Sequence, residues 1–153
     1  NLFLAVAPHL GWRAVTVTDR RTATDFAYAL RDLAAAFPAA ERIVLVVDNL
    51  NTHTAGALYQ TFPPAEAFRL WHRFEVHYTP KHGSWLNMAE LELSVLARQC
   101  LDRRLPDVAT LKAETAAWVA ARNAIAAPIV WRFTVGDARQ RLPRVYPILD
   151  MPG

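Results

Sequence analysis

The chain has 153 residues, of which 53% are hydrophobic and 20% are charged, enough for one domain that buries about two thirds of its unfolded surface. Its net charge of +3 and pI near 9.4 are modestly basic and permit an anionic partner such as nucleic acid without requiring one. No apolar run approaches the roughly 20 residues of a membrane span, and a single cysteine, Cys100, excludes a disulfide framework or a cysteine metal site within one chain.

A hairpin is predicted at the start of the sequence. Residues 2–7 and 13–18 are mostly apolar or β-branched, which is typical of strands. The sequence Pro8-His9-Leu10-Gly11 between them favours a tight turn. We therefore expect the two strands to pair in the antiparallel sense.

A helix and a buried strand are expected next. Apolar residues recur at helical spacing between Phe26 and Phe37, and Thr22 or Thr24 can cap the start of this helix. The run from Ile43 to Val47 does not alternate with polar residues, which is typical of a central strand covered on both faces. It ends in Asp48, and polar residues at the C-terminal end of such a strand commonly line a crevice.

The remaining elements alternate short helices with one more strand and end in further helices. In chain order they are a short helix through Leu58 and Tyr59, a second through residues 67–71, a strand at 74–78, a long helix that follows the loop at 80–84 and reaches Cys100, a helix from Pro106 through Ala121, and a short helix at 137–142. Glu90 lies in the first turns of the long helix. This order is that of a mixed α/β domain.

Asp48 and Glu90 are the two acids whose positions favour a metal site. A carboxylate at a strand end and another on a nearby helix can bind Mg²⁺, which takes one or two protein carboxylates beside water and substrate phosphate. Two such ions support in-line phosphoryl displacement. The pattern indicates phosphodiester cleavage or transfer. The alternative for any single acid is a solvated surface residue, which is the commoner case.

Glu90 is preferred over its neighbour Glu92 as the metal ligand. The two residues lie about 200° apart around a helix, so both cannot face one metal pair. The residue one turn after Glu90 is the small Ser94, which leaves room for ions, whereas Glu92 is followed by Leu96.

Two segments, Asp48-Asn49-Leu50-Asn51-Thr52-His53 and Tyr78 to Glu90, resemble the catalytic core of mariner-type bacterial insertion-sequence transposases, which are DDE superfamily endonucleases. The resemblance extends from Asn1 to about Tyr146. It implies a ribonuclease H-like mixed sheet flanked by helices, and cleavage and strand transfer of DNA with Mg²⁺ or Mn²⁺ at the ends of a mobile element.

The resemblance also assigns roles to particular residues. It makes Asp48 and Glu90 the second and third acids of the catalytic triad and ligands of the metal. The residues expected to line the same site are Asn49, His53, Asn87 and Ser94.

The partners implied are double-stranded DNA, comprising the element's terminal repeats and the target, and further copies of the chain in a homo-oligomer. A bacterial cytoplasm, at the nucleoid and without membrane contact, is the expected location. Basic and aromatic residues expected at the DNA are Lys81, His82, Trp85, Arg98, Arg103 and Arg104. Two alternatives stay open, because Trp85 could pack under its helix and the last two arginines could serve a helix C-terminus.

Three features depart from the family pattern. The 41 residues between Asp48 and Glu90 are more than is usual, and we assign the excess to a loop around Pro63-Pro64. Met88-Ala89 replaces the Pro-Ile that often precedes the glutamate. No residue matches the first acid, which in the family lies on the first strand of the sheet.

We therefore expect residues 1–153 to be a single DDE catalytic domain truncated at its N-terminus and inactive alone. The missing first strand belongs between the hairpin and the Asp48 strand, so its loss leaves strand edges unpaired, and the chain is expected to be marginally stable or to associate. The alternative is a catalytically inactive transposase remnant that only binds DNA or pairs with an intact subunit.

Overall fold

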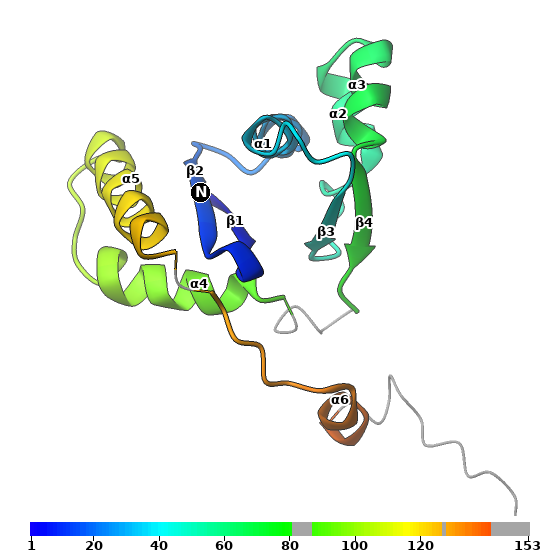
Figure 1. The fold of residues 1–153 in the computed structure, drawn as a ribbon. Coiled ribbons are helices and arrows are strands. Elements are labelled where there is room, and N and C mark those ends of the chain that lie inside the picture. The colour runs from blue at the N-terminus through cyan, green and yellow to red at the C-terminus, as the bar shows by residue number, and fades with distance from the viewer. Residues whose placement is uncertain (81–86, 127, 142–153) are drawn as a thin grey trace, which may run out of the picture.

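The computed structural model shows a mixed α/β fold and describes residues 1–80, 87–126 and 128–141 (Figure 1). In chain order its elements are β1 (Leu2–Ala7), the 3-10 turn η1 (Pro8–Leu10), β2 (Trp12–Val17), α1 (Ala23–Ala36), β3 (Ile43–Val47), α2 (Ala55–Thr61), α3 (Pro64–Trp71), β4 (Phe74–Tyr78), α4 (Ala89–Leu96), the π-helical turn η3 (Ala97–Leu101), α5 (Val108–Ile125) and α6 (Val135–Arg141). The predicted order of strands and helices is confirmed.

The predicted hairpin is present. β1 and β2 pair in the antiparallel sense, with Leu2 opposite Val17 and Ala7 opposite Trp12. Gly11 ends the connecting turn with a φ of 61°, a conformation that glycine adopts at little cost. A side chain at this position would also collide with the backbone of Ala126, which follows α5.

Helix limits follow local capping chemistry. Thr22 caps α1, because its side chain accepts a hydrogen bond from the Asp25 N–H while the Asp25 carboxylate accepts one from the Thr22 N–H. These hydrogen bonds from Thr22 hold the pKa of Asp25 below its usual value. At α5, the side chain of Asp107 accepts from the N–H of Thr110. Both starts lie where the sequence predicts them.

The second sheet pairs β3 with β4 in the parallel sense, with Ile43 opposite Phe74 and Val47 opposite Tyr78. Helices α2 and α3 form the connection between these strands. The assignment of the excess residues to a loop around Pro63-Pro64 is wrong because most of them are helical. α2 ends at Thr61, and Pro64 is already the first residue of α3. Proline is well suited to that position because the first turn of a helix does not use its N–H.

The expectation that β3 is covered on both faces is wrong for the described residues. Val44 and Val46 are 63% and 49% exposed, whereas Val47 is buried. Within the described ranges β3 pairs on one edge only, with β4, and β1 pairs only with β2. Two two-stranded sheets therefore stand in place of the single ribonuclease H-like sheet that the resemblance implies.

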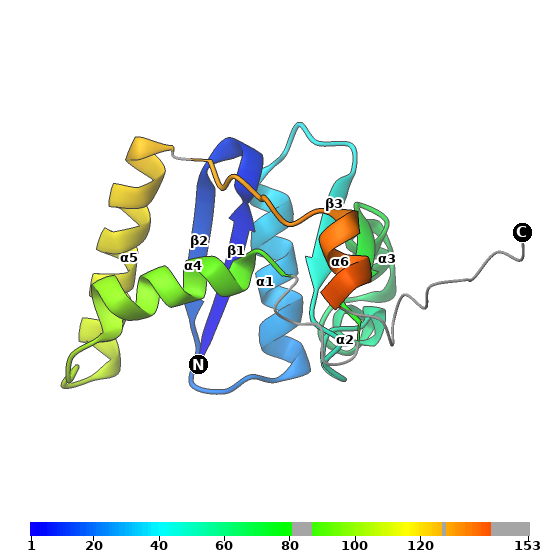
Figure 2. The same cartoon turned by 90° about the horizontal axis from the view of Figure 1, so that it is seen from below.

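Two apolar clusters hold these sheets and helices together. The first lies under α1 and includes Phe26, Leu30, Leu58 and Phe74. In the second, Leu96, Cys100 and Trp118 pack against the hairpin. Figure 1 shows α1 on one side of β1, and Figure 2 shows α4 crossing the hairpin on the other. Burial raises the pKa of the Cys100 thiol, which favours the unreactive protonated form.

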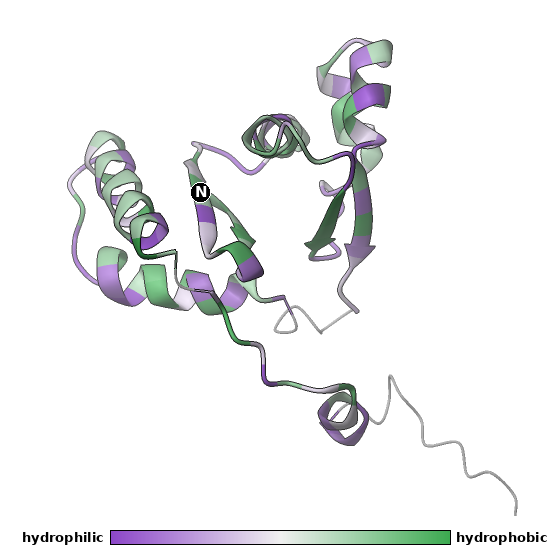
Figure 3. Cartoon of the chain, viewed as in Figure 1, coloured by the Kyte–Doolittle hydropathy of each residue, from purple (hydrophilic) through white to green (hydrophobic). Residues whose placement is uncertain are grey.

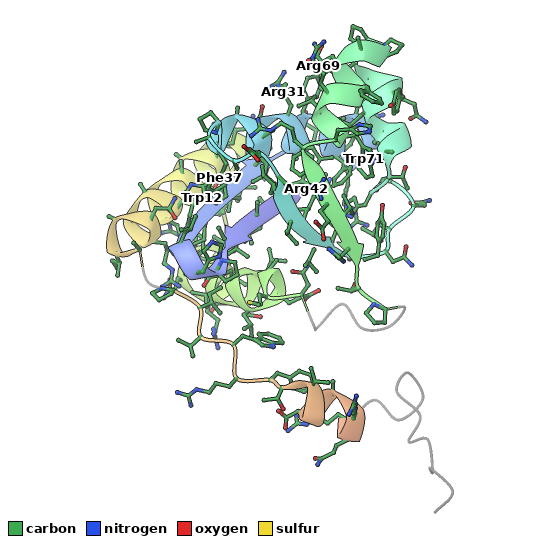
Figure 4. All side chains as sticks on the ribbon, turned by 45° about the vertical axis from the view of Figure 1, so that its right-hand side comes forward. Trp12, Arg31, Phe37, Arg42, Arg69 and Trp71 are labelled. Atoms are coloured by element: carbon green, nitrogen blue, oxygen red, sulfur yellow. The ribbon has the colours of Figure 1, made fainter. Side chains whose placement is uncertain are left out.

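An apolar cavity of about 1010 Å³ separates the two sheets. Residues of β1, β3 and α1 line it, so the strand edges left unpaired in the described structure border the same space. Figure 3 shows that β1 and β3, the two inner strands, are largely hydrophobic. Trp12 and Phe37 lie side by side on its wall (Figure 4), with ring centroids 4.9 Å apart.

The last described helix, α6, lies apart from both sheets in Figure 1. Among the helices of the described ranges, none combines the length and apolar character needed to cross a membrane.

Candidate active site

Asp48 is placed by the strand that precedes it. Val47 is buried at the end of β3, and the chain then leaves the sheet, so the Asp48 side chain is only partly covered, at 39% exposed. Asp48 also borders the cavity between the two sheets. A carboxylate thus lies at the C-terminal end of a parallel strand, at the mouth of an apolar space.

His53 reaches Asp48 through a short turn in which the His53 N–H donates to the carbonyl of Leu50. Nδ1 of His53 lies 2.6 Å from Oδ1 of Asp48. This distance is short, but its geometry is not that of a hydrogen bond. Neither ring nitrogen of His53 forms a hydrogen bond with a described residue. The Asp48 carboxylate and the imidazole therefore form a close polar pair.

Three aromatic residues hold His53 in place, two at its ring and one at its backbone carbonyl. Its ring stacks on Phe26, with centroids 4.3 Å apart and an angle of 24° between the planes, and a tilted Phe3 lies at 6.5 Å. The hydroxyl of Tyr78 donates to the His53 carbonyl at 2.8 Å. With 9% of its surface exposed, the ring has little freedom to leave Asp48.

Asn87 sets the start of the helix that carries Glu90. Its side-chain oxygen accepts from the N–H of Ala89 at 3.1 Å, and its carbonyl accepts from the N–H of Glu90 at 3.0 Å. Asn87 and Ala89 both line the cavity that Asp48 borders. The structure thus brings Asp48, His53 and the beginning of α4 around one space.

Glu90 itself is exposed, and its carboxylate makes no hydrogen bond or ion pair with any described residue. Ser94 is also exposed and donates its hydroxyl to the Glu90 carbonyl at 3.0 Å. Asn49 is exposed as well. Neither Ser94 nor Asn49 lines the cavity, whereas His53 and Asn87 do.

Glu92 is in the opposite situation, two residues further along. Its side chain is 4% exposed and receives two hydrogen bonds from Arg13, at 2.7 and 3.0 Å, and a further one from Arg122 at 3.0 Å. The hydrogen bonds from Arg13 hold the pKa of Glu92 below its usual value. Both carboxylate oxygens of Glu92 accept hydrogen bonds from these arginines. They are therefore not available to a metal ion, which agrees with the preference for Glu90 as the ligand.

The residues expected at the DNA divide into two groups. Lys81, His82 and Trp85 lie outside the residues that the structure describes. Arg98, Arg103 and Arg104 are exposed around the end of η3 and the loop that follows it. Of these, Arg103 forms an ion pair with Glu114 on α5.

The donor set suits a hard divalent cation. Asp48 and Glu90 supply carboxylate oxygens, and Mg²⁺ typically takes one or two of these while the substrate phosphate and water complete its octahedral shell. In the described ranges no three histidine, cysteine, aspartate or glutamate side chains gather into a candidate metal group. Asp48, His53 and Glu90 are all among the described residues and do not form such a group, so Asp48 and Glu90 as ligands of Mg²⁺ or Mn²⁺ stay a prediction from the sequence.

Arg13 and Arg122 are important to this arrangement, yet sequence reasoning did not single them out. Arg13 occupies one position of a half-buried strand and Arg122 one position of a long helix, and neither context is unusual. The sequence gives one indirect indication. Glu92, Leu96 and Cys100 are spaced four residues apart, so Glu92 lies on the same helix face as two apolar residues, and a buried carboxylate there needs a cationic partner.

Comparison with known proteins gives one family. A sequence model described as DDE superfamily endonuclease matches residues 1–112. The matched region includes both sheets, Asp48, Glu90 and the first residues of α5. No curated protein and no solved structure gives a significant match.

Proposed function

Because the chain belongs to the DDE superfamily endonucleases, we propose that it is the catalytic domain of a mariner-type bacterial transposase, which cuts DNA at the ends of a mobile element and joins the cut strands to a target. The observation that carries the proposal is the shared cavity. Asp48 at the end of β3 and the first turn of the Glu90 helix border the same space, although 41 residues separate the two acids.

Asp48 and Glu90 hold the divalent metal in this proposal. Bound Mg²⁺ or Mn²⁺ supplies the positive charge that activates an attacking oxygen and stabilises a leaving one in phosphoryl transfer. His53 orients Asp48, because it contacts one carboxylate oxygen and leaves the other available. Asn87 fixes the first turn of α4 and with it the backbone of Glu90.

A third carboxylate enters on a strand that fills the cavity between β1 and β3. The cavity is apolar and is bordered by both strands, so an extended segment there would pair with two backbone edges and cover Val44 and Val46. An acid near one end of that strand would lie close to Asp48. We propose that this strand precedes Asn1 in the complete protein.

The DNA lies along the exposed arginines near the end of η3. Arg98 and Arg104 form no ion pair in the described part of the chain, so both cations are free to meet phosphate oxygens. In this proposal the acting form is a homo-oligomer.

The test uses the upstream-extended protein, meaning this chain together with the sequence encoded before Asn1. Nicking of a duplex carrying candidate element ends is measured with Mg²⁺ and with Mn²⁺. Asp48→Asn and Glu90→Gln should each abolish nicking, whereas the control Glu75→Gln, at an exposed residue of β4, should not. DNA binding without nicking by the unmutated protein would instead support the inactive remnant.

A further inference from the structure

A buried cluster of three charges connects α4 to the hairpin and to α5. Arg13 of β2 is 1% exposed and Glu92 of α4 is 3% exposed, and Arg122 of α5 completes the cluster from the surface side. Arg13 meets both oxygens of Glu92 through Nε and a terminal nitrogen, at 2.7 and 3.0 Å. Two parallel hydrogen bonds of this kind fix both the distance between the guanidinium and the carboxylate and their relative orientation.

The hairpin side of this cluster is itself rigidly attached. Asn123 of α5 accepts from the Arg13 N–H and donates to the Arg13 carbonyl, both at 2.8 Å. A terminal nitrogen of Arg13 also donates to the Gly11 carbonyl at 2.6 Å. The guanidinium is therefore a fixed point against which α4 is placed.

Apolar packing restrains the rotation of α4 mainly near its C-terminal end, through Leu96 and the half-buried Val95. Only Glu92 and Leu96 are buried in this helix, while Leu91 and Leu93 are 48% and 36% exposed. Leu91 and Leu93 lie about 200° apart around the helix, so a roll of about 100° in either direction would bury one of them, at about 25 cal/mol per Å² covered. The same roll would swing Glu92 off Arg13 and leave a charge unpaired in the core, which opposes it strongly.

We propose that Arg13 and Glu92 are positioning residues for the metal site, and this inference rests on the proposed function. The fork between them holds Glu92 toward β2. Because residues two apart on a helix lie about 200° apart around it, the fork directs Glu90 away from the hairpin and toward solvent, where it is exposed. The preference for Glu90 as ligand thus has a structural cause in its neighbour.

The test measures Mn²⁺ binding to the upstream-extended protein by electron paramagnetic resonance, without DNA. Arg13→Lys keeps the buried charge but loses the fork, and the apolar pair Arg13→Met with Glu92→Leu removes the charges while filling the space. Each variant should unfold cooperatively and bind Mn²⁺ about tenfold more weakly, the usual size of effect for residues behind a metal ligand. Glu75→Gln serves as the matched control on an exposed ion pair.

A second arm separates positioning from simple loss of stability. In a Glu90→Gln background, Arg13→Lys should weaken the remaining Mn²⁺ binding no further, because its effect passes through Glu90. Folded Arg13→Lys and apolar-pair variants with unchanged Mn²⁺ affinity would overturn the inference alone. Unchanged affinity in both Asp48→Asn and Glu90→Gln would overturn the proposed metal site, and the inference with it.

Discussion

Nδ1 of His53 lies 2.6 Å from Oδ1 of Asp48, and the imidazole that makes this contact is stacked on Phe26 of α1. The carboxylate is thereby tied to the helix that covers the cavity. An acid at a strand end can rotate freely unless a neighbour restrains it. The close contact with His53 restrains one oxygen of Asp48, and in the proposed function the other oxygen binds the metal.

Replacing His53 should therefore weaken metal binding while the protein stays folded. His53→Gln keeps a polar group of similar reach but loses the ring that stacks on Phe26. We expect Mn²⁺ affinity to fall about tenfold, the usual size of effect for a residue that orients a metal ligand. The measurement is Mn²⁺ titration of the upstream-extended protein, with His77→Gln on the exposed side of β4 as the control. Equal affinity in the two variants would contradict the role of His53.

The Glu92 cluster predicts a pH dependence of stability. Hydrogen bonds from Arg13 lower the pKa of Glu92 below its ordinary 4.5. Stabilisation from this group is thus fully present above pH 4.5 and is lost as the pH falls through the lower pKa of the folded state. Glu92→Gln should reduce the free energy of unfolding at pH 7 by about 3 kcal/mol.

That difference should shrink as the pH falls below 4.5, because the wild-type carboxylate then becomes neutral as well. Urea unfolding of the two proteins at pH 7, 5 and 3 measures it. A gap between wild type and Glu92→Gln that is the same at all three values would show that the charge of Glu92 does not stabilise the fold.

The hairpin turn gives a prediction that does not depend on function. Gly11→Ala combines a φ of 61° with a collision against the Ala126 backbone, so it should destabilise the fold by at least about 1 kcal/mol. Gly56→Ala in α2 is the matched control, because its added Cβ would meet only Thr54 Oγ1 at 3.4 Å. Gly56 is the second residue of α2, and alanine there should leave the stability unchanged or raise it slightly, because alanine loses less backbone entropy on folding than glycine. Thermal unfolding of both variants decides the matter, and equal melting temperatures would contradict the packing described at Gly11.

Local chemistry explains why much of this fold was predictable from the sequence. Thr22 and Asp107 mark helix starts, and Gly11 marks the hairpin turn, because each acts through its immediate neighbours. The exposure of Val44 was not predictable in this way. It depends on which strand lies beside β3, and an apolar run alone does not specify that neighbour.

The candidate site divides along the same line. Asp48 and His53 were found from a short segment, and the turn between them brings them together. The role of Arg13 depends on a contact with Glu92 that spans 79 residues of sequence. Such contacts leave no periodic signal in a single sequence, so their discovery required the structure.

The unpaired edges that border the cavity predict association of the 153-residue chain. β1 and β3 offer unpaired backbone groups to any extended segment, including one from another copy, and β3 also exposes Val44 and Val46. We expect the apparent mass in light scattering to rise with concentration, and Val44→Lys to reduce that rise by placing a charge on the β3 edge. A constant monomer mass over the whole concentration range would contradict an open strand edge.

In the proposed function, Asp48 and Glu90 bind one metal centre. The most direct measurement is a crystal structure of the upstream-extended protein with Mn²⁺, in which anomalous scattering locates the ion. We expect a Mn²⁺ peak bound by carboxylate oxygens of both Asp48 and Glu90, at about 2.1 Å from metal to oxygen as for Mg²⁺. A Mn²⁺ peak bound elsewhere, with the two carboxylates on separate faces of the molecule, would contradict it.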